Sequence, residues 1–316
     1  MERKKKPLRT EQSDSPTSAL PPPPWTELPA DITANILRRL SVAEILENAQ
    51  KVCTTWRSVS KDPAMWRKID MSQGKDRAAR IMCKQAVDRS QGQLIDLKIG
   101  FFCDDDLLAY ISQRQISIKP LLFTSSQLRC LLIASCVAHA ISGNALANAA
   151  KRFPLLEELH LFHSRVPSES LEIIGRSCPL LKSFSLGGAA PFYAKDDFVE
   201  PECNTEALAI AKSMPGLRHL TLFGNAMSNV GLLAVVEGCI HLESLDLRRC
   251  FRVNLEGDIG NQCSQKLKCL KQPDDSIADL EYHDSDSFDV EYEEGFYGCD
   301  WDYLRMTMAP LTKAST

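Results

Sequence analysis

Two six-residue stretches of the same form decide the fold of this chain. Residues 217–222 read LRHLTL, and residues 242–247, 25 positions later, read LESLDL. Both follow the pattern L-x-x-L-x-L, whose alternation places the later leucines on one side of a strand. With Ile or Phe allowed for Leu, the pattern recurs as LIDLKI from residue 94, LRCLLI from 128, LEELHL from 156, LKSFSL from 181 and a shortened LKCL from 267. This period predicts a solenoid with one strand and one helix in each repeat.

The segments between these stretches have the composition of short helices. They include ALANAAKRFP, SLEIIGRSCP, ALAIAKSMP and LLAVVEGCI, whose apolar residues are expected to pack on the strand leucines. We therefore predict an α/β fold over residues 94–272, a curved parallel sheet with helices on its outer side. Two of the intervals between strands are longer than the others, and we interpret residues 113–125 and 187–203 as loop insertions.

The apolar spacing and the capping signals in residues 25–70 predict a separate helical unit. Pro29 is suited to the first turn of a helix, and one face of that helix carries Ile32, Ile36, Leu37 and Leu40. Ser41 followed three residues later by Glu44 is the signature of a capping box and predicts a second helix. A unit of about 45 residues without a disulfide or metal usually needs a neighbour to be stable. Residues 71–93 are predicted to form a helix that links this unit to the repeats.

Both ends of the chain are predicted to be disordered. Residues 1–24 are basic and Pro-rich, whereas residues 273–316 are acidic. Residues 274–302 hold 12 Asp and Glu and no Lys or Arg, so the net charge of -4 leaves +8 on the rest of the chain. Four of those charges lie in residues 1–10, so the middle is close to neutral and indicates neither nucleic-acid nor membrane binding. KKKPLR is either a nuclear import signal or a solubilising tail, and we expect a nuclear or cytoplasmic location, or both.

The sequence carries no pattern of a catalytic or metal site. Its 12 cysteines include no C-x-x-C pair, which favours buried thiols in a reducing compartment. The six histidines are dispersed, and no Gly-rich phosphate loop, G-x-S-x-G or H-E-x-x-H is present. We therefore predict a protein that is not an enzyme and that has no cofactor and no metal.

The predicted strands also indicate a partner-binding surface. Because the leucines point inward, the alternating residues face the concave side of the arc. The candidates there are Glu158, His160, Phe162, His219, Thr221, Phe223, Asp246 and Arg248. Phe162 and Phe223 occupy equivalent positions, and two interpretations of them remain open. They are anchors for a bound partner, or they fold down over the strand ends as packing.

The helical unit carries a motif that extends over its full length. Its parts are Leu28-Pro29-x-Asp31-Ile32, Ile36-Leu37-x-x-Leu40, Val52-Cys53-x-x-Trp56-Arg57 and Trp66-Arg67. This motif resembles the F-box. The resemblance implies docking on a Skp-family adaptor, which ties the F-box to the cullin scaffold of a ubiquitin ligase. The adaptor-binding residues that it implies are Leu28, Pro29, Ile32, Ile36, Leu37, Leu40, Val52, Cys53 and Trp56.

Stretches such as ILENAQKVC, LRHLTLFGN and HLESLDLRRCFRVNLEG resemble the plant F-box and leucine-rich-repeat proteins grouped with Skp-interacting partner 19. The resemblance covers roughly residues 25–275. It implies the substrate-recognition subunit of a Skp-cullin-F-box (SCF) E3 ubiquitin ligase, which holds an unknown protein substrate on the repeats. It also implies core-packed thiols at Cys136, Cys178, Cys239 and Cys250.

Two alternatives remain open at this point. In the first, the chain is a leucine-rich-repeat interaction protein that acts independently of ubiquitination, and its F-box helices only cap the apolar end of the solenoid. In the second, the chain is a small-molecule receptor, as some F-box leucine-rich-repeat proteins are for plant hormones.

Overall fold

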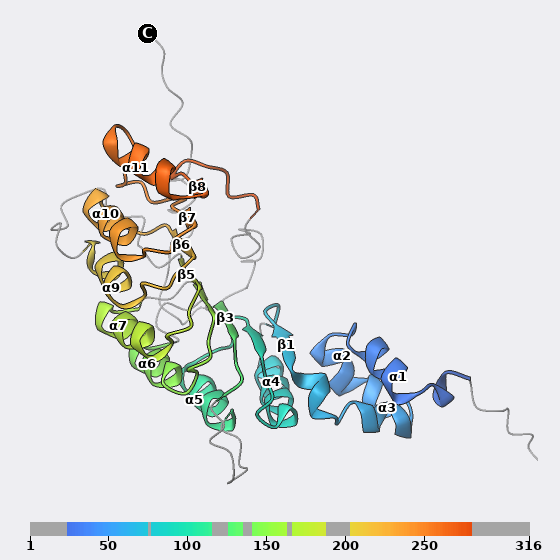
Figure 1. Ribbon diagram of the computed structural model, residues 1–316. Coiled ribbons are helices and arrows are strands. Elements are labelled where there is room, and N and C mark those ends of the chain that lie inside the picture. The colour runs from blue at the N-terminus through green and yellow to red at the C-terminus, as the bar shows by residue number, and fades with distance from the viewer. Residues whose placement is uncertain are drawn as a thin grey trace, which may run out of the picture.

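The computed structural model of the chain describes residues 24–74, 77–115, 126–134, 141–162, 166–187 and 203–279. The chain forms an arc with a helical unit at one end and helix α11 and strand β8 at the other (Figure 1). The predicted disorder of the two tails falls mainly on residues outside these ranges. Residues 273–279, which we assigned to the acidic tail, are described, and they pack on the last strands.

The repeats build one parallel sheet whose strands follow chain order. The strands are β1 (Lys68–Met71), β2 (Asp96–Ile99), β3 (Cys130–Ala134), β4 (Glu158–Phe162), β5 (Ser183–Gly187), β6 (His219–Phe223), β7 (Ser244–Asp246) and β8 (Cys269–Lys271). Strands β2 to β8 are those predicted from the leucine pattern. Strand β1 was not predicted, because its stretch WRKIDM offers only Ile69 and Met71 as inward apolar residues.

The helices of the repeats lie along the outer side of the arc (Figure 1). They are α5 (Asp105–Arg114), α6 (Gly143–Ala150), α7 (Ser168–Ser177), α9 (Thr205–Ser213), α10 (Asn229–Gly238) and α11 (Asp258–Lys266). The strand leucines are buried between these helices and the sheet, as Leu159 and Leu161 are on β4. The predicted α/β solenoid is confirmed. No helix in the described part of the chain is long and apolar enough to cross a membrane.

Three of the four cysteines for which the resemblance implied core packing are packing residues. Cys178 and Cys239 follow directly after α7 and α10, and both are buried together with Cys250. The Sγ of Cys239 lies 3.6 Å from the carbonyl oxygen of Met214 in the preceding repeat. Cys136 lies outside the described residues, and so do 116–125 and 188–202 of the two predicted insertions.

The N-terminal unit consists of short helices around a small apolar interior. They are η1 (Pro24–Glu27), α1 (Ala30–Leu37), α2 (Val42–Glu47), η2 (Ala49–Lys51), α3 (Thr54–Val59) and η3 (Pro63–Trp66), where η marks a 3₁₀-helix. The predicted capping box opens α2. The Ser41 hydroxyl accepts from the Glu44 N–H at 3.2 Å, and the Glu44 carboxylate accepts from the Ser41 N–H at 2.8 Å. Pro29 is the residue directly before α1.

Helix α4 (Arg77–Ser90) joins the two units, within the range predicted for a linker helix. The Arg89 guanidinium donates to the Ser60 carbonyl at 3.2 Å and to Gln50 Oε1 at 2.7 Å, and it lies 5.4 Å from the centre of the Trp66 ring. One continuous cluster of buried side chains extends from Leu37 in the first unit to Leu267 in the last repeat. The helical unit is therefore docked on the solenoid through a shared core.

Arg89→Ala tests this junction. Loss of the hydrogen bonds from a charged group to Ser60 and Gln50 should lower the free energy of unfolding by about 1.5–3 kcal/mol, measured by urea denaturation. Arg176→Ala is the matched control, because its ion pair with Glu172 lies on the exposed surface of α7 and should contribute about 1 kcal/mol or less. Equal losses in the two variants would contradict the proposed importance of the junction.

Candidate functional site

Helix α1 divides its side chains between the core and the surface. Thr33 and Leu37 are both 0% exposed and point into the helical unit. Ile32 and Ile36 are 43% and 39% exposed, and they lie one turn apart on the same side of the helix. A helix with two apolar sides of which only one is buried offers the other side to a partner.

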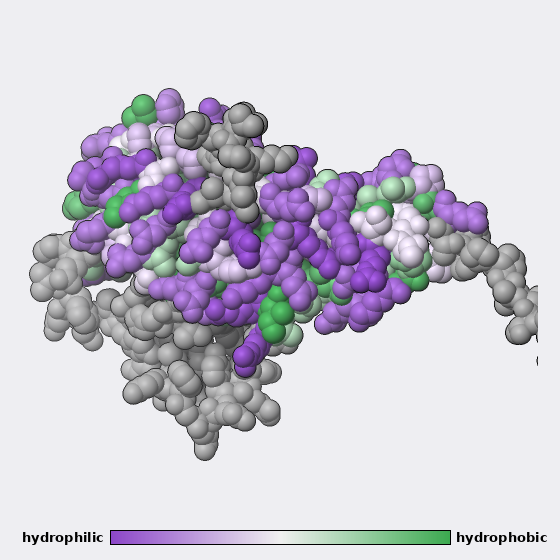
Figure 2. Space-filling view, turned by 90° about the horizontal axis from the view of Figure 1, so that it is seen from below, coloured by the Kyte–Doolittle hydropathy of each residue, from purple (hydrophilic) through white to green (hydrophobic). Residues whose placement is uncertain are grey.

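Further exposed apolar residues lie beside this stripe. Of the ten exposed large apolar side chains found among the described residues, four belong to the helical unit, namely Trp25, Ile32, Ile36 and Val52. We call these four the apolar surface of the helical unit. Figure 2 shows hydrophobic residues gathered at this end of the molecule. The Trp25 ring meets the Trp56 ring edge to face, with centroids 5.8 Å apart, so the half-buried Trp56 supports the surface from below.

The residues predicted to bind the adaptor do not all lie at the surface. Pro29, Ile32, Ile36 and Val52 are exposed, and Leu28, Leu40, Cys53 and Trp56 are half-buried. Leu37 is fully buried, which corrects its assignment as a contact, because it faces the interior one position away from the exposed stripe. Cys53 has a local structural task, since its Sγ accepts from the Trp56 N–H at 3.5 Å and caps α3.

The second surface is the concave side of the sheet. The registers of β4, β5 and β6 align their concave-side residues in three rows. The rows are Glu158, Ser183 and His219; His160, Ser185 and Thr221; and Phe162, Gly187 and Phe223. We call these nine positions the concave patch. Six of the eight residues predicted to bind substrate therefore lie side by side, although Glu158 and Phe223 are far apart in the sequence.

The third row decides between the two interpretations of Phe162 and Phe223. Gly187 lies between them, and a Cβ atom there would come within 3.3 Å of the Phe162 ring and 3.4 Å of the Phe223 Cβ. Phe223 is only 6% exposed, whereas Phe162 is half-buried. Phe223 is therefore a packing residue, which corrects the expectation that it offers an exposed anchor, and Phe162 keeps part of its ring at the surface.

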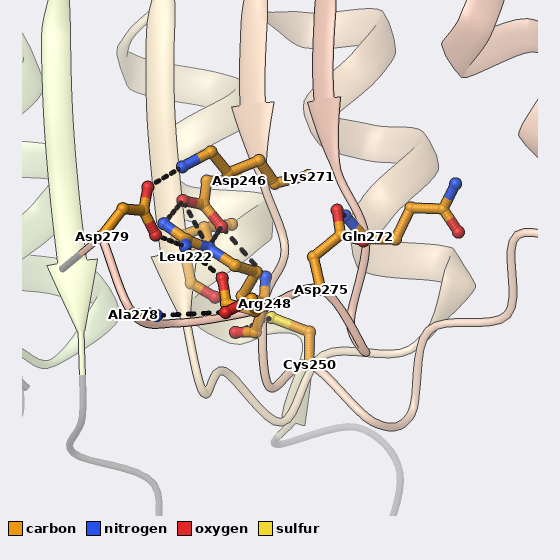
Figure 3. Close-up of polar contacts among 10 residues, drawn as sticks. Leu222, Asp246, Arg248, Cys250, Lys271, Gln272, Asp275, Ala278 and Asp279 are labelled. Carbon is orange, nitrogen blue, oxygen red and sulfur yellow. Dashed lines mark hydrogen bonds and ion pairs between the residues drawn. The ribbon is translucent and has the colours of Figure 1, made fainter.

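Asp246 and Arg248 form a buried ion pair at the C-terminal end of the sheet (Figure 3). The Arg248 Nη2 lies 2.7 Å from Asp246 Oδ2, and Nη1 donates to the Ser276 carbonyl at 2.6 Å and also contacts Asp279. Arg248 is 1% exposed. This corrects the prediction that it faces a partner: the guanidinium holds residues 273–279 against the sheet.

His160 has a polar neighbour at each of its two ring nitrogens. Its Nδ1 lies 2.8 Å from Ser185 Oγ, and its Nε2 lies 3.8 Å from Glu158 Oε2. Burial lowers the pKa of the imidazole, which keeps the ring neutral at neutral pH. Among the described residues, His160 also groups with Glu158 and Cys130 as three side chains able to ligate a metal ion.

Sequence reasoning missed part of this face. Asp96 and Lys98 on β2 and Cys130 and Leu132 on β3 continue the first two rows. The signal was present, because the alternation that singled out Glu158 in LEELHL applies equally to LIDLKI and LRCLLI. The concave side therefore extends across β3 to β2, where Asp96 and Lys98 add charged groups.

A groove of about 590 Å³ lies where the helical unit meets β1 and β2. Its lining mixes charged and apolar side chains, among them Arg38, Ser41, Trp66, Asp96 and Lys98. The groove shares Asp96 and Lys98 with the concave side of β2, so the concave face continues into the junction between the two units.

Comparison with known proteins shows the family of this chain. Residues 25–72 match the F-box-like family. The chain is 44% identical to F-box protein SKIP19 of Arabidopsis thaliana over 270 residues, which cover 84% of this chain and 82% of SKIP19. This chain belongs to the F-box/LRR-repeat family. The helical unit is its F-box, and the solenoid is its leucine-rich-repeat domain.

Other relatives differ in how much of their length is matched. F-box/LRR-repeat protein 23 of Arabidopsis thaliana is 45% identical over 257 residues, but these cover 80% of this chain and only 54% of that protein. F-box protein SKIP1 of the same organism is 27% identical over 276 residues, or 79% of this chain. Each of these three matches thus extends over most of this chain, well beyond the F-box.

Asp279→Asn tests whether residues 273–279 are held by charge. Hydrogen bonds from Lys271 and Arg248 lower the pKa of Asp279 from 3.8 to about 2. The contribution of this carboxylate to stability is therefore fully present above its ordinary pKa and is lost as the pH falls through about 2. The Asn variant should show faster amide hydrogen exchange in residues 273–279 at neutral pH.

The matched control for this exchange measurement is Asp275→Asn. Asp275 accepts from the Gln272 N–H at 2.7 Å, and none of the Arg248 contacts described above involves it. Its replacement should leave the Arg248 contacts in place and change the exchange of residues 276–279 much less. If both variants accelerate exchange equally, the attachment does not depend on the Arg248–Asp279 pair.

Proposed function

We propose that this F-box/LRR-repeat protein is the substrate-recognition subunit of an SCF E3 ubiquitin ligase. The apolar surface of the helical unit binds a Skp-family adaptor and, through it, the cullin scaffold. The concave patch of the repeats binds a protein substrate. The observation that carries the proposal is the exposed Ile32–Ile36 stripe on a helix whose other side already closes the core.

The two sides of the F-box argue against a role as a mere cap of the solenoid. A terminal cap buries one side against the repeats and presents a polar outer side to water. The inner side is present here as Leu37, Ile45 and Trp66. The outer side also exposes four large apolar side chains, Trp25, Ile32, Ile36 and Val52, which a cap does not need. Burial of such side chains by a partner is favourable by about 25 cal/mol per Å² of apolar surface.

In the mechanism that follows, this chain positions a substrate and does not react with it. A receptor that holds a substrate beside a ubiquitin-charged enzyme raises the effective concentration of the substrate's lysines. The shared core and the Arg89 contacts fix the F-box relative to the repeats, so the two binding surfaces are presented at a set separation. The chemical step belongs to the partners.

The buried thiols support a role without covalent chemistry by this chain. Burial raises the pKa of Cys83 and Cys178 to about 12 and that of Cys239 to about 11. A thiol with such a pKa stays protonated at neutral pH and is a poor nucleophile. These cysteines are therefore unsuited to carrying ubiquitin as a thioester.

Pro29→Ala combined with Ile36→Ala tests the adaptor surface. Wild-type protein should capture a purified Skp-family adaptor at about micromolar concentration, and the double variant should bind it at least about tenfold more weakly, since exposed anchors carry most of the energy of an interface. Ile240→Ala is the matched control, because Ile240 is an equally apolar, exposed residue of the repeats. Equal binding by wild type and double variant would exclude this adaptor surface.

His219→Ala combined with Thr221→Ala tests the concave patch. Both side chains are exposed or half-buried on β6, so their truncation should leave the fold and adaptor capture intact. Proteins that accumulate in cells lacking this chain should be cleared by re-expressed wild type and should persist with the variant. Clearance by the variant at the wild-type rate would remove these two residues from the proposed substrate surface.

A further inference from the structure

Three ligating side chains converge on the concave side of β3 and β4. The Sγ of Cys130, a carboxylate oxygen of Glu158 and a ring nitrogen of His160 all lie within 4.8 Å of one another. Cys130 and Glu158 are register partners on adjacent strands. His160 follows Glu158 by two residues and therefore lies on the same side of the sheet. The sheet itself sets this convergence, since its register fixes where each side chain starts.

The histidine of this cluster is oriented as a ligand would be. Its Nδ1 is 2.8 Å from the Ser185 hydroxyl on β5, which can accept the Nδ1 proton. In that tautomer Nε2 carries the lone pair, and Nε2 is the atom that lies 3.8 Å from the Glu158 carboxylate. An outer hydrogen bond that fixes the tautomer and the ring is typical of metal-binding histidines.

The charges around the cluster favour a cation. Asp96 is the register partner of Cys130 on β2, so two carboxylates flank the thiol. Among the described residues, no donor forms a hydrogen bond with the buried Oδ1 atom of Asp96. The charged groups that act on His160 are Glu158, Lys98 and Asp96, so Lys98 is the one cation among them.

We propose that Cys130, Glu158 and His160 bind a zinc ion on the concave face. Sulfur, imidazole nitrogen and carboxylate oxygen together are a donor set that zinc accepts in tetrahedral geometry. On binding, the thiol proton leaves to solvent, and the thiolate, the carboxylate and the imidazole Nε2 each donate a lone pair to Zn²⁺. No electron is transferred. The positive charge of Zn²⁺ offsets the repulsion between the thiolate and the two carboxylates beside it.

This site does not depend on the proposed function. Adaptor binding by the apolar surface of the helical unit and metal binding by β3 and β4 use different residues, so either can fail without the other. A bound ion would fix Glu158 and His160, two residues of the concave patch, in one conformation. It would therefore make partner binding on this patch sensitive to zinc.

The experiment uses the full chain, purified and dialysed against a chelator, with Co²⁺ and Zn²⁺ as probes. Co²⁺ gives a strong sulfur-to-metal charge-transfer absorption when a thiolate binds it. We expect one equivalent to produce this absorption, and Zn²⁺ to displace it. Cys130→Ser should abolish the absorption, and His160→Gln and Glu158→Gln should each weaken Zn²⁺ binding by about tenfold or more. Binding of less than one equivalent, or a spectrum that Cys130→Ser leaves unchanged, would overturn the proposal.

Two matched controls lie on the same face of the sheet. Cys269 is an exposed thiol on β8, and His219 is an exposed imidazole on β6. Cys269→Ser and His219→Gln should keep the full absorption and the wild-type Zn²⁺ affinity. Loss of the absorption in Cys269→Ser would place the thiolate ligand elsewhere and contradict the assignment.

Ser185→Ala tests whether the hydrogen bond to His160 contributes to metal binding. It removes the hydroxyl that orients His160 while leaving all proposed ligands, and it should weaken Zn²⁺ binding by about tenfold. Saturating Zn²⁺ should raise the melting temperature of the wild type and of Cys269→Ser, since only the folded chain assembles the site. The metal-free variants should melt near the metal-free wild type. A Zn²⁺-dependent rise of equal size in Cys130→Ser would contradict the site.

Discussion

Burial of the strand leucines is the interaction on which the rest of the structure depends. The strand leucines are almost fully buried, as Leu159, Leu161, Leu220 and Leu222 show. A single repeat has too few side chains to cover its own leucines. Each is covered only when the neighbouring strand pairs alongside and the helix of its own repeat closes over it. The parallel register follows from this, and the register in turn sets the rows of residues on the concave face.

The same requirement explains how the ends of the solenoid are built. At the N-terminal end, β1 and α4 continue the core, and the F-box closes it with Leu37 and Trp66. At the C-terminal end, residues 273–279 are tied to the sheet by Arg248. The F-box thus serves as a cap with its inner side while keeping Ile32 and Ile36 outside. One small unit meets a structural need and retains an apolar surface for a partner.

The concave face shows how neighbours change what a side chain does. Phe162 and Phe223 hold equivalent positions on their strands, but Phe223 is buried and Phe162 stays half-exposed. Arg248 follows the same alternation as Glu158, yet a buried ion pair with Asp246 and the returning chain remove it from the surface. Cys130 and His160, on different strands, acquire a shared chemistry only because the register brings them together.

Local spacing and local hydrogen bonds were sufficient to predict the repeat, the strands β2 to β8, the outer helices and the capping box of α2. The F-box was likewise predicted from its motif between Leu28 and Arg67. Tertiary packing was needed to place Leu37 in the core and Ile36 at the surface, to add β1 to the sheet and to bury Phe223 and Arg248. Those outcomes depend on which element packs against each residue, and contacts between distant repeats are not encoded in the spacing of any one of them.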